Sequence, residues 1–204
     1  MPDILTLMRQ PKTIIVFTGI FCTGKRTLAS KLNEQLGYYL LSLDDYRVTL
    51  YDTYGFTNKQ EKSILDLEAK TNFAIKCIQL MRAGDSFIVE HAFTEDWQEF
   101  FDSMTSTYGY HYYVVNCRFQ SFDVLWNRRI QRDHNLNQRH VGLTAWKYFK
   151  DTVYATDVHD YNDEAKKRYR EAYKYGAYTR LIGEECFEDE TIIELLGGTV
   201  EDLL

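Results

Sequence analysis

The residues best suited to chemistry form the segment Gly19-Ile20-Phe21-Cys22-Thr23-Gly24-Lys25-Arg26-Thr27. It matches the pattern GxxxxGK, follows the β-branched run KTIIVFT and opens a helical pattern, which is the context that a phosphate-binding loop requires. Glycines let consecutive backbone N–H groups face a phosphate, and the helix N-terminus adds partial positive charge. The residues expected to bind a nucleoside triphosphate are Gly19, Cys22, Thr23, Gly24, Lys25, Arg26 and Thr27, with Lys25 reaching the β and γ oxygens. The alternative is a glycine-rich turn with a surface lysine.

One position of this loop departs from the usual pattern. The residue after the lysine is normally Ser or Thr, whose hydroxyl binds Mg²⁺, and here it is Arg26. Guanidinium cannot ligate a cation, so Thr27 or water must take this role, or metal binding is weaker than usual. Arg26 could instead hold a phosphate. Glu90 ends the run FIVE and is expected to lie beside the bound substrate, where it would orient Mg²⁺ through water. The alternative is a carboxylate that caps a helix.

A second constellation is Leu43-Asp44-Asp45-Tyr46-Arg47, where Asp44 lies nineteen residues beyond Lys25. It directly follows the second predicted strand. A carboxylate here can accept the proton of an attacking hydroxyl, and an arginine three residues later can hold an anionic group of the substrate. The alternative is an aspartate that caps a helix and forms a surface ion pair with Arg47.

Strands and helices alternate around these segments. A strand over 12–18, a helix over 25–36 and a strand over 38–43 form a βαβ unit. Apolar steps of three and four residues predict that a long helix, ended by Gly84, packs one face on the core: Ile64, Leu67, Thr71, Ala74, Ile78 and Met81. Further strands are predicted over 87–89 and 111–117, further helices over 94–107 and through Trp126 and Ile130, and residues 178–182 are a candidate fifth strand.

This alternation predicts an α/β fold of three layers, as in P-loop NTPases. The parallel sheet has about five strands, helices cover both faces, and ligands sit beyond the carboxyl ends of the strands. With 204 residues and no proline-rich linker, we expect a single domain over 1–204, with a helical lid at approximately 126–145 and an acidic segment at 184–204.

Charge and hydropathy restrict the partners. The formal charge is −6, but eight acids and no lysine or arginine lie within residues 183–204, so the remainder carries +2. This balance permits a small polyanionic ligand and disfavours long nucleic acid. No apolar run approaches the roughly 18 residues of a membrane span, and no export signal is evident, so a cytoplasmic protein without membrane contact is expected. The four cysteines have no zinc-ligand spacing.

Together, the phosphate loop and the strand followed by DDYR resemble P-loop kinases of the polynucleotide 5′-kinase type. They also resemble the related small predicted kinases labelled AAA-type ATPases or zeta-toxin-like kinases. The stretches YDTYGFTN at Tyr51–Asn58 and RHVG at Arg139–Gly142 look like the second group, and the resemblance covers about residues 14–148. It implies that Lys25 is the catalytic lysine, Asp44 the general base and Arg47 a ligand of a substrate phosphate.

Folds of this kind carry a lid after the fourth strand, whose arginines clamp the transferring phosphoryl group. Residues 118–140 contain five arginines and two aspartates, a local charge of +3. Arg128 and Arg132 share one helix face and are the candidate catalytic arginines, and Arg139 is a candidate substrate ligand. The alternative for any one of them is a solvated helix face.

The sequence therefore predicts a phosphotransferase that moves the γ-phosphoryl group of ATP, with Mg²⁺, to a hydroxyl of a small-molecule or nucleotide-like acceptor. The alternative is a nucleotide-binding module or a partner-coupled NTPase without kinase activity, because Arg26 replaces the metal-binding hydroxyl.

Overall fold

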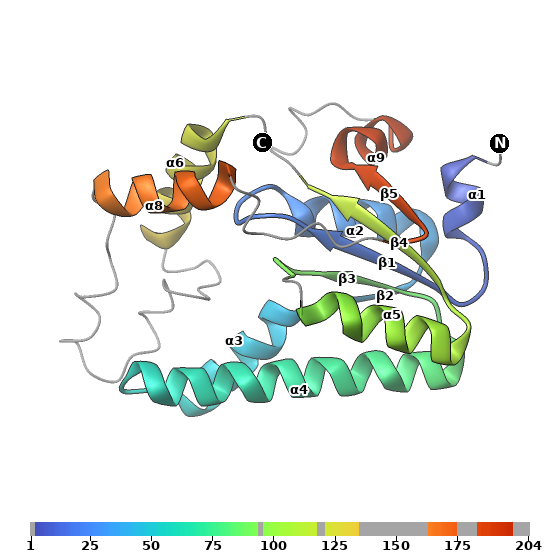
Figure 1. The fold of residues 1–204 in the computed structure, drawn as a ribbon, viewed down its shortest axis with the longest axis horizontal. Helices are drawn as coiled ribbons and strands as arrows, with labels where there is room; N and C mark the ends of the chain where they lie inside the picture. Colours follow the sequence, from blue (N-terminus) through green and yellow to red (C-terminus); the bar gives the residue numbers. More distant parts are fainter. Residues whose placement is uncertain (1–2, 94–95, 118–120, 135–162, 175–182, 198–204) are drawn as a thin grey trace.

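A parallel sheet with helices on both faces forms the centre of the molecule (Figure 1). The computed structural model describes residues 3–93, 96–117, 121–134, 163–174 and 183–197. The strands are β1 (Thr13–Thr18), β2 (Tyr39–Ser42), β3 (Phe87–Glu90), β4 (His111–Asn116) and β5 (Glu185–Glu188). The helices are α1 (Ile4–Met8), α2 (Lys25–Leu36), α3 (Leu43–Tyr54), α4 (Lys59–Ala83), α5 (Asp96–Tyr108), α6 (Phe122–His134), α8 (Asp163–Lys174) and α9 (Asp189–Leu195).

The sheet has the strand order β2-β3-β1-β4-β5, and its neighbouring strands are parallel. This architecture confirms the predicted three-layer α/β fold. The fifth strand is Glu185–Glu188, inside the segment that the sequence distinguishes only by its acidity. The candidate strand at 178–182 lies outside the described residues. Of the predicted lid, residues 126–134 belong to α6, and the remainder also lies outside the described residues.

Alternating residues of β1 face two separate cores. Ile14 and Val16 pack in the core that contains Phe73 of α4 and Phe101 of α5. Ile15 and Phe17 pack in the opposite core, which contains residues of α1, α2 and α9: Met8, Leu28, Leu32 and Ile192. Because β1 is buried along its whole length, its sequence is a continuous apolar run that ends at the phosphate loop.

Helix α2 begins and ends at glycines with left-handed backbone. Gly24 has φ 82°, and Gly37 has φ 69° and donates its N–H to the Asn33 carbonyl over 2.7 Å. A residue with a Cβ is disfavoured in this conformation, so the two glycines set the boundaries of the helix. The helix buries Leu28 and Leu32 against the sheet, and its N-terminus therefore stays at the carboxyl end of β1.

The predicted core face of α4 is correct at Met81 and wrong in the first half of the helix. Ile64 and Leu67 are 59% and 66% exposed, and Thr71 is also exposed. The buried stripe shares only Met81 with the predicted one and consists of Leu65, Ala69, Phe73, Cys77, Leu80 and Met81. Apolar residues occur on two faces of this helix, and the aromatic contacts of Phe73 show which face is buried. Its ring packs on Tyr46, Phe93 and Trp97 with centroid distances of 5.8, 6.1 and 5.5 Å.

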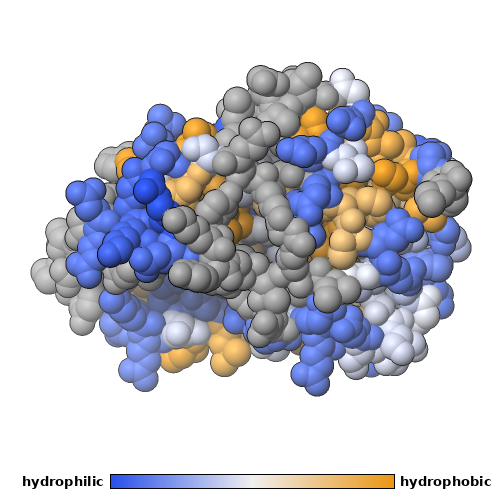
Figure 2. All heavy atoms as spheres, turned by 45° about the horizontal axis from the view of Figure 1, so that its top comes forward, coloured by the Kyte–Doolittle hydropathy of each residue, from blue (hydrophilic) through white to orange (hydrophobic). Residues whose placement is uncertain are grey.

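Helices α6 and α8 pack on each other beside the phosphate loop (Figure 1). Phe122 and Trp126 of α6 form an apolar cluster with Ala165 of α8, and Phe21 of the loop packs against it. Asp123 pairs with Lys166 and Arg170 over 2.7 Å each. Hydrophilic residues gather at this end of the molecule in the space-filling view (Figure 2).

No helix within the described residues is both long enough and apolar enough to cross a bilayer.

Candidate active site

The phosphate loop leaves the end of β1 through a glycine that touches β4. Gly19 has φ 138°, and a Cβ at this position would lie 2.2 Å from the carbonyl oxygen of Cys117. Only glycine fits such a close approach of two backbones. Within the loop, the buried Thr23 hydroxyl donates to the Ile20 carbonyl over 3.0 Å, and Cys22 adopts a left-handed φ of 59°. The loop therefore lies at the carboxyl end of the central strand β1, which is the position that the motif predicts.

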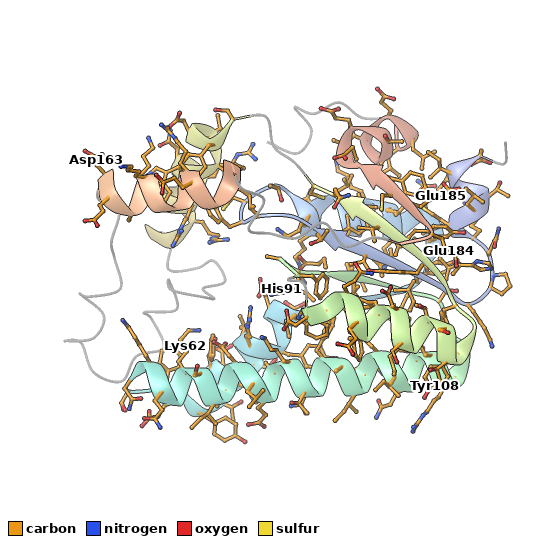
Figure 3. The ribbon with its side chains drawn as sticks, viewed as in Figure 1. Lys62, His91, Tyr108, Asp163, Glu184 and Glu185 are labelled. Carbon is orange, nitrogen blue, oxygen red and sulfur yellow. The ribbon has the colours of Figure 1, made fainter. Side chains whose placement is uncertain are left out.

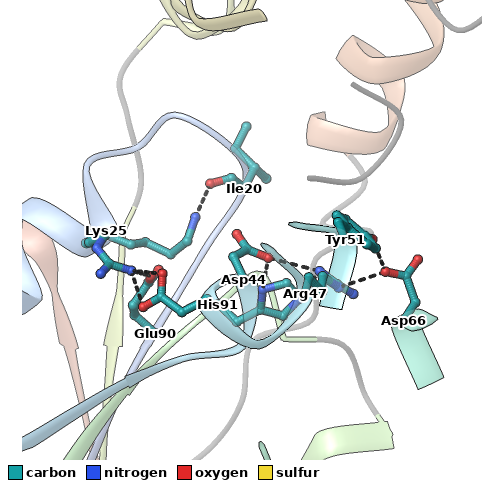
Figure 4. A network of polar contacts seen from close by, with 10 residues as sticks. Ile20, Lys25, Asp44, Arg47, Tyr51, Asp66, Glu90 and His91 are labelled. Carbon is teal, nitrogen blue, oxygen red and sulfur yellow. Dashed lines mark hydrogen bonds and ion pairs between the residues drawn. The ribbon is translucent and has the colours of Figure 1, made fainter. Parts of the chain in front are cut away.

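Lys25 folds back into this loop. Its Nζ donates to the Ile20 carbonyl over 2.5 Å and lies 3.4 Å from the Thr23 hydroxyl (Figure 4). Burial lowers the pKa of Lys25, and the charges of Glu90 and Asp44 act in the opposite direction. A partly buried ammonium with neighbouring carboxylates can exchange its carbonyl contact for a phosphate oxygen.

Asp44 lies in the first turn of α3, as predicted, but it does not cap the helix. The N-cap is Ser42, and Asp44 points to side chains from other parts of the chain. Its Oδ1 accepts from Arg47 Nη1 over 3.0 Å and lies 3.2 Å from His91 Nδ1. Arg47 Nη1 also lies 3.3 Å from His91 Nε2, so the three side chains form a closed triangle (Figure 4). These tertiary contacts distinguish Asp44 from a simple surface ion pair.

His91 is a further candidate site residue, which the sequence did not predict. It follows Glu90 directly at the carboxyl end of β3, and its backbone N–H donates to the Phe17 carbonyl over 3.1 Å. Arginine can only donate, so the contact with Arg47 requires that Nε2 accepts and that the proton resides on Nδ1, facing Asp44. Burial lowers the pKa of His91 and favours this neutral form, although Asp44 raises it. The available signal was position, because ligands bind beyond strand ends.

Arg47 is held from its far side as well. Its Nε lies 3.3 Å from Asp66 Oδ1 on α4, and Lys62 Nζ donates to Asp66 Oδ2 over 2.7 Å. The Tyr51 hydroxyl also donates to Asp66, and burial raises the pKa of this phenol. We refer to Asp44, Arg47, Tyr51, Lys62, Asp66 and His91 as the acceptor network. Figure 3 shows Lys62 near one end of α4 and Tyr108 beside its opposite end, with His91 between them in this view.

Arg26 points to two carboxylates. Its Nη1 donates to Asp45 over 2.9 and 2.7 Å and lies 3.5 Å from Glu90 Oε1. The side chains of Arg26 and Asp45 are 47% and 46% exposed, whereas that of Glu90 is only 4% exposed. Exposed ion pairs such as Arg26–Asp45 contribute about 0.2–1 kcal/mol, so water or a phosphate can compete for this contact. We refer to these three residues as the Arg26 cluster.

The described residues fit a protein-held metal poorly. No group of three or more His, Cys, Asp and Glu side chains that could hold a metal occurs in the part of the chain that the structure describes. The position of the usual hydroxyl ligand is taken by a guanidinium that already contacts Glu90, and Thr27 is exposed in the first turn of α2. The assignment of Mg²⁺ to Thr27 and Glu90 stays a prediction.

Two arginines of α6 contact the phosphate loop. Arg128 Nη1 donates to the Cys22 carbonyl over 3.4 Å, which places this candidate lid residue beside the donor site. Arg129 is 6% exposed, and its guanidinium packs over the rings of Phe21 and Trp126 at 5.0 and 5.5 Å. Arg132 lies one turn further along α6. The predicted substrate ligand Arg139 lies outside the described residues.

Comparison with known proteins agrees with the α/β fold described above. The sequence profile of the AAA domain family matches residues 14–156. No curated protein sequence matches the chain significantly. A candidate kinase from Chloroflexus aurantiacus superposes with a TM-score of 0.64 at 22% identity, covering 88% of this chain and 88% of that one.

Two further solved structures share the fold. Shikimate kinase from Bacteroides thetaiotaomicron superposes with a TM-score of 0.52 at 17% identity, covering 91% of this chain and 94% of its own. APS kinase from Mycobacterium tuberculosis, solved in complex with AMPPNP and APS, has a TM-score of 0.50 at 18% identity and covers 95% of this chain and 97% of its own. At these identities the likeness concerns the fold.

Proposed function

The chain belongs to the AAA domain family, and on that premise we propose that it transfers the γ-phosphoryl group of ATP to a hydroxyl of a small-molecule or nucleotide-like acceptor. One observation carries the proposal: the ammonium of Lys25 and the carboxylate of Asp44 face the same space beyond the strand ends (Figure 4). The two charges also interact, because Asp44 raises the pKa of Lys25. A phosphoryl group held at the loop and a hydroxyl held at the acceptor network can therefore meet between them.

The roles of the side chains follow from their contacts. The loop and Lys25 bind the phosphates of the donor, and Arg128 adds positive charge from α6. The acceptor oxygen attacks the γ-phosphorus, its proton passes to Asp44, and the bond between the γ-phosphorus and the β–γ bridging oxygen breaks, releasing ADP. Arg47 and His91 orient Asp44 for this transfer through its Oδ1 atom. Most of the rate enhancement in such reactions comes from positioning and electrostatics.

The named relatives are consistent with this reaction class. Two of the three reported structures are kinases of small molecules, and one of them contains AMPPNP. The acceptor itself is not inferred from them. Within the acceptor network, the positive charges of Arg47 and Lys62 are balanced by Asp44 and Asp66. An acceptor phosphate would therefore have to share the guanidinium of Arg47 with these two carboxylates.

A second candidate function is nucleotide binding without transfer. It is favoured by Arg26, which replaces a hydroxyl that kinases of this fold commonly use for Mg²⁺. The two functions differ in one respect that can be measured. A kinase passes the γ-phosphoryl group to an added hydroxyl compound, whereas a binding module retains ATP unchanged.

Transfer from radiolabelled ATP to a panel of sugars, nucleosides and hydroxy acids tests the proposal. With an accepting compound, we expect Asp44→Asn to reduce turnover by about 10²- to 10⁴-fold, because the proton acceptor is lost, while ATP affinity changes little. Asp45→Asn is the matched control, since this neighbouring carboxylate contacts Arg26 on the donor side. Equal turnover of the parent and Asp44→Asn would contradict the proposed base, and ATP binding without transfer to any compound would favour the second function.

A further inference from the structure

The Arg26 cluster places a single nitrogen among three carboxylate oxygens. Nη1 of Arg26 lies 2.9 and 2.7 Å from the two oxygens of Asp45 and 3.5 Å from Oε1 of Glu90. The three residues come from the start of α2, the start of α3 and the end of β3. Three carboxylate oxygens from two separate elements, α3 and β3, therefore lie around one cationic group, as they would around a divalent metal bound beyond the carboxyl ends of the strands.

The cation here is part of the chain. Guanidinium offers only N–H donors and no lone pair, so it cannot coordinate a metal, and its charge opposes a second cation at the same carboxylates. Arg26 is the residue directly after Lys25, so its backbone position is fixed by the phosphate loop and by Gly24. The loop therefore has two neighbouring side-chain cations, with the buried carboxylate of Glu90 beside both of them.

Arg26 also has the means to contact a nucleotide. Its side chain and that of Asp45 are about half exposed, so the pair can open without unpacking the core. Because guanidinium has five N–H donors in a planar fork, it can donate to a phosphate oxygen and still face Glu90. Lysine would offer one ammonium at this position, and serine or threonine would offer a metal ligand.

We infer that Arg26 takes the place of a protein-held divalent cation, so that the phosphate loop binds nucleoside triphosphates without a requirement for Mg²⁺. The inference rests on the proposed binding of ATP at this loop. In this arrangement the Arg26 side chain, rather than a metal ion, supplies positive charge beside the β and γ phosphates. Asp45 and Glu90 hold this side chain at the loop before the nucleotide arrives.

Equilibrium binding of ATP, measured by calorimetry at constant ionic strength in EDTA and in Mg²⁺, tests this inference. For the parent protein we expect affinities within about threefold of each other in the two conditions. Arg26→Ser removes a charge-assisted contact and should lower affinity in EDTA by about ten- to a hundredfold, with partial recovery in Mg²⁺ because a hydroxyl is restored. Arg82→Ser is the matched control, because Arg82 contacts the Tyr108 hydroxyl, at the far end of α4 from the acceptor network (Figure 3), and should behave as the parent.

Glu90→Gln provides a second test that does not remove Arg26. Asp45 still holds Arg26 in this variant, and the buried negative charge that repels the phosphates is removed, so ATP affinity in EDTA should rise severalfold. Circular dichroism of each variant checks that it is folded.

Three results decide the matter. Parent protein that binds ATP only with Mg²⁺, together with an Arg26→Ser variant that matches the parent in EDTA, would overturn the inference in favour of Thr27 and Glu90 as metal ligands. The inference would also be overturned if Glu90→Gln bound ATP in EDTA as the parent does and Mg²⁺ no longer raised its ATP affinity. Parent protein that binds no ATP in either condition would instead refute the proposed function, and the inference with it.

Discussion

Gly19 offers a quantitative test of how the phosphate loop is seated. A Cβ at this position would lie 2.2 Å from the Cys117 carbonyl oxygen, well inside the 3.0 Å that real Cβ contacts respect. The obstructing atom is backbone, and the Cys117 N–H donates to the Thr18 carbonyl over 2.8 Å, so β4 cannot retreat without breaking the sheet. Alanine must therefore either displace the start of the loop or distort the end of β4.

The expected cost of Gly19→Ala combines two effects. A non-glycine residue in such a backbone region costs about 1–3 kcal/mol, and overpacking costs about 1–3 kcal/mol more. We expect a loss of about 3 kcal/mol or more in the free energy of unfolding. With a urea m-value of about 2 kcal/mol per molar, the midpoint should fall by about 1.5 M. Because the loop moves with its first residue, ATP affinity should also fall at least about tenfold.

Gly37→Ala is the matched control. Gly37 also has a left-handed φ, of 69°, but no atom lies within 4 Å of the added Cβ. Alanine in the left-handed conformation destabilises the folded state, and the reduced conformational entropy of the unfolded chain offsets part of that loss. The free energy of unfolding should therefore fall by about 1 kcal/mol. That corresponds to a urea midpoint lowered by about 0.5 M, with unchanged ATP affinity. Equal losses in the two variants, or full ATP binding by Gly19→Ala, would refute the reasoning about the close approach.

Two further predictions concern charged groups of the site. Lys25→Ala should leave the urea midpoint near that of the parent and weaken ATP binding in calorimetry, because the hydrogen bonds of Lys25 within the described residues go to the loop itself; an unchanged affinity would contradict the loop assignment. For His91, the folded pKa lies below its ordinary value of 6.5, mainly through burial. Below pH 6.5 the unfolded state therefore binds more protons at His91 than the folded state does. The contribution of His91 to the free energy of unfolding is complete above about pH 6.5 and is lost as the pH falls through the folded pKa. Urea unfolding at pH 7.5 and 5 should show a smaller loss of stability for His91→Gln than for the parent, and a loss equal to the parent's would contradict the buried neutral imidazole.

The parts of the site that could be predicted from sequence are those set by local pattern. The run from Thr13 to Thr18 is buried on both faces, and such strands are recognisable from composition alone. The loop and the start of α2 follow from glycine positions and a lysine. Asp44 and Asp45 were placed correctly at the start of α3 because a strand ends immediately before them. In each case the determinant lies within a few residues of the feature.

The parts that could not be predicted depend on contacts between distant segments. The buried face of α4 was misplaced because Ile64 and Leu67 satisfy helical spacing as well as Leu65 and Ala69 do, and only the packing against the sheet decides between the two faces. The fifth strand was not predicted because it is an edge strand with an exposed Glu185 and a half-buried Glu188, where an apolar pattern is not required. His91 has no sequence signature apart from its place after a strand.

Consecutive residues at the N-termini of α2 and α3 have different partners. Successive helical residues point about 100° apart, so neighbours in sequence face different groups. In α2, Lys25 turns into the loop and Arg26 turns toward α3. In α3, Asp45 meets Arg26, whereas Asp44 turns to His91 and the acceptor network. The Arg26–Asp45 pair therefore joins the donor and acceptor helices through the residues adjacent to the proposed catalytic ones. A substitution at Asp45 should alter the donor side first, and one at Asp44 the acceptor side.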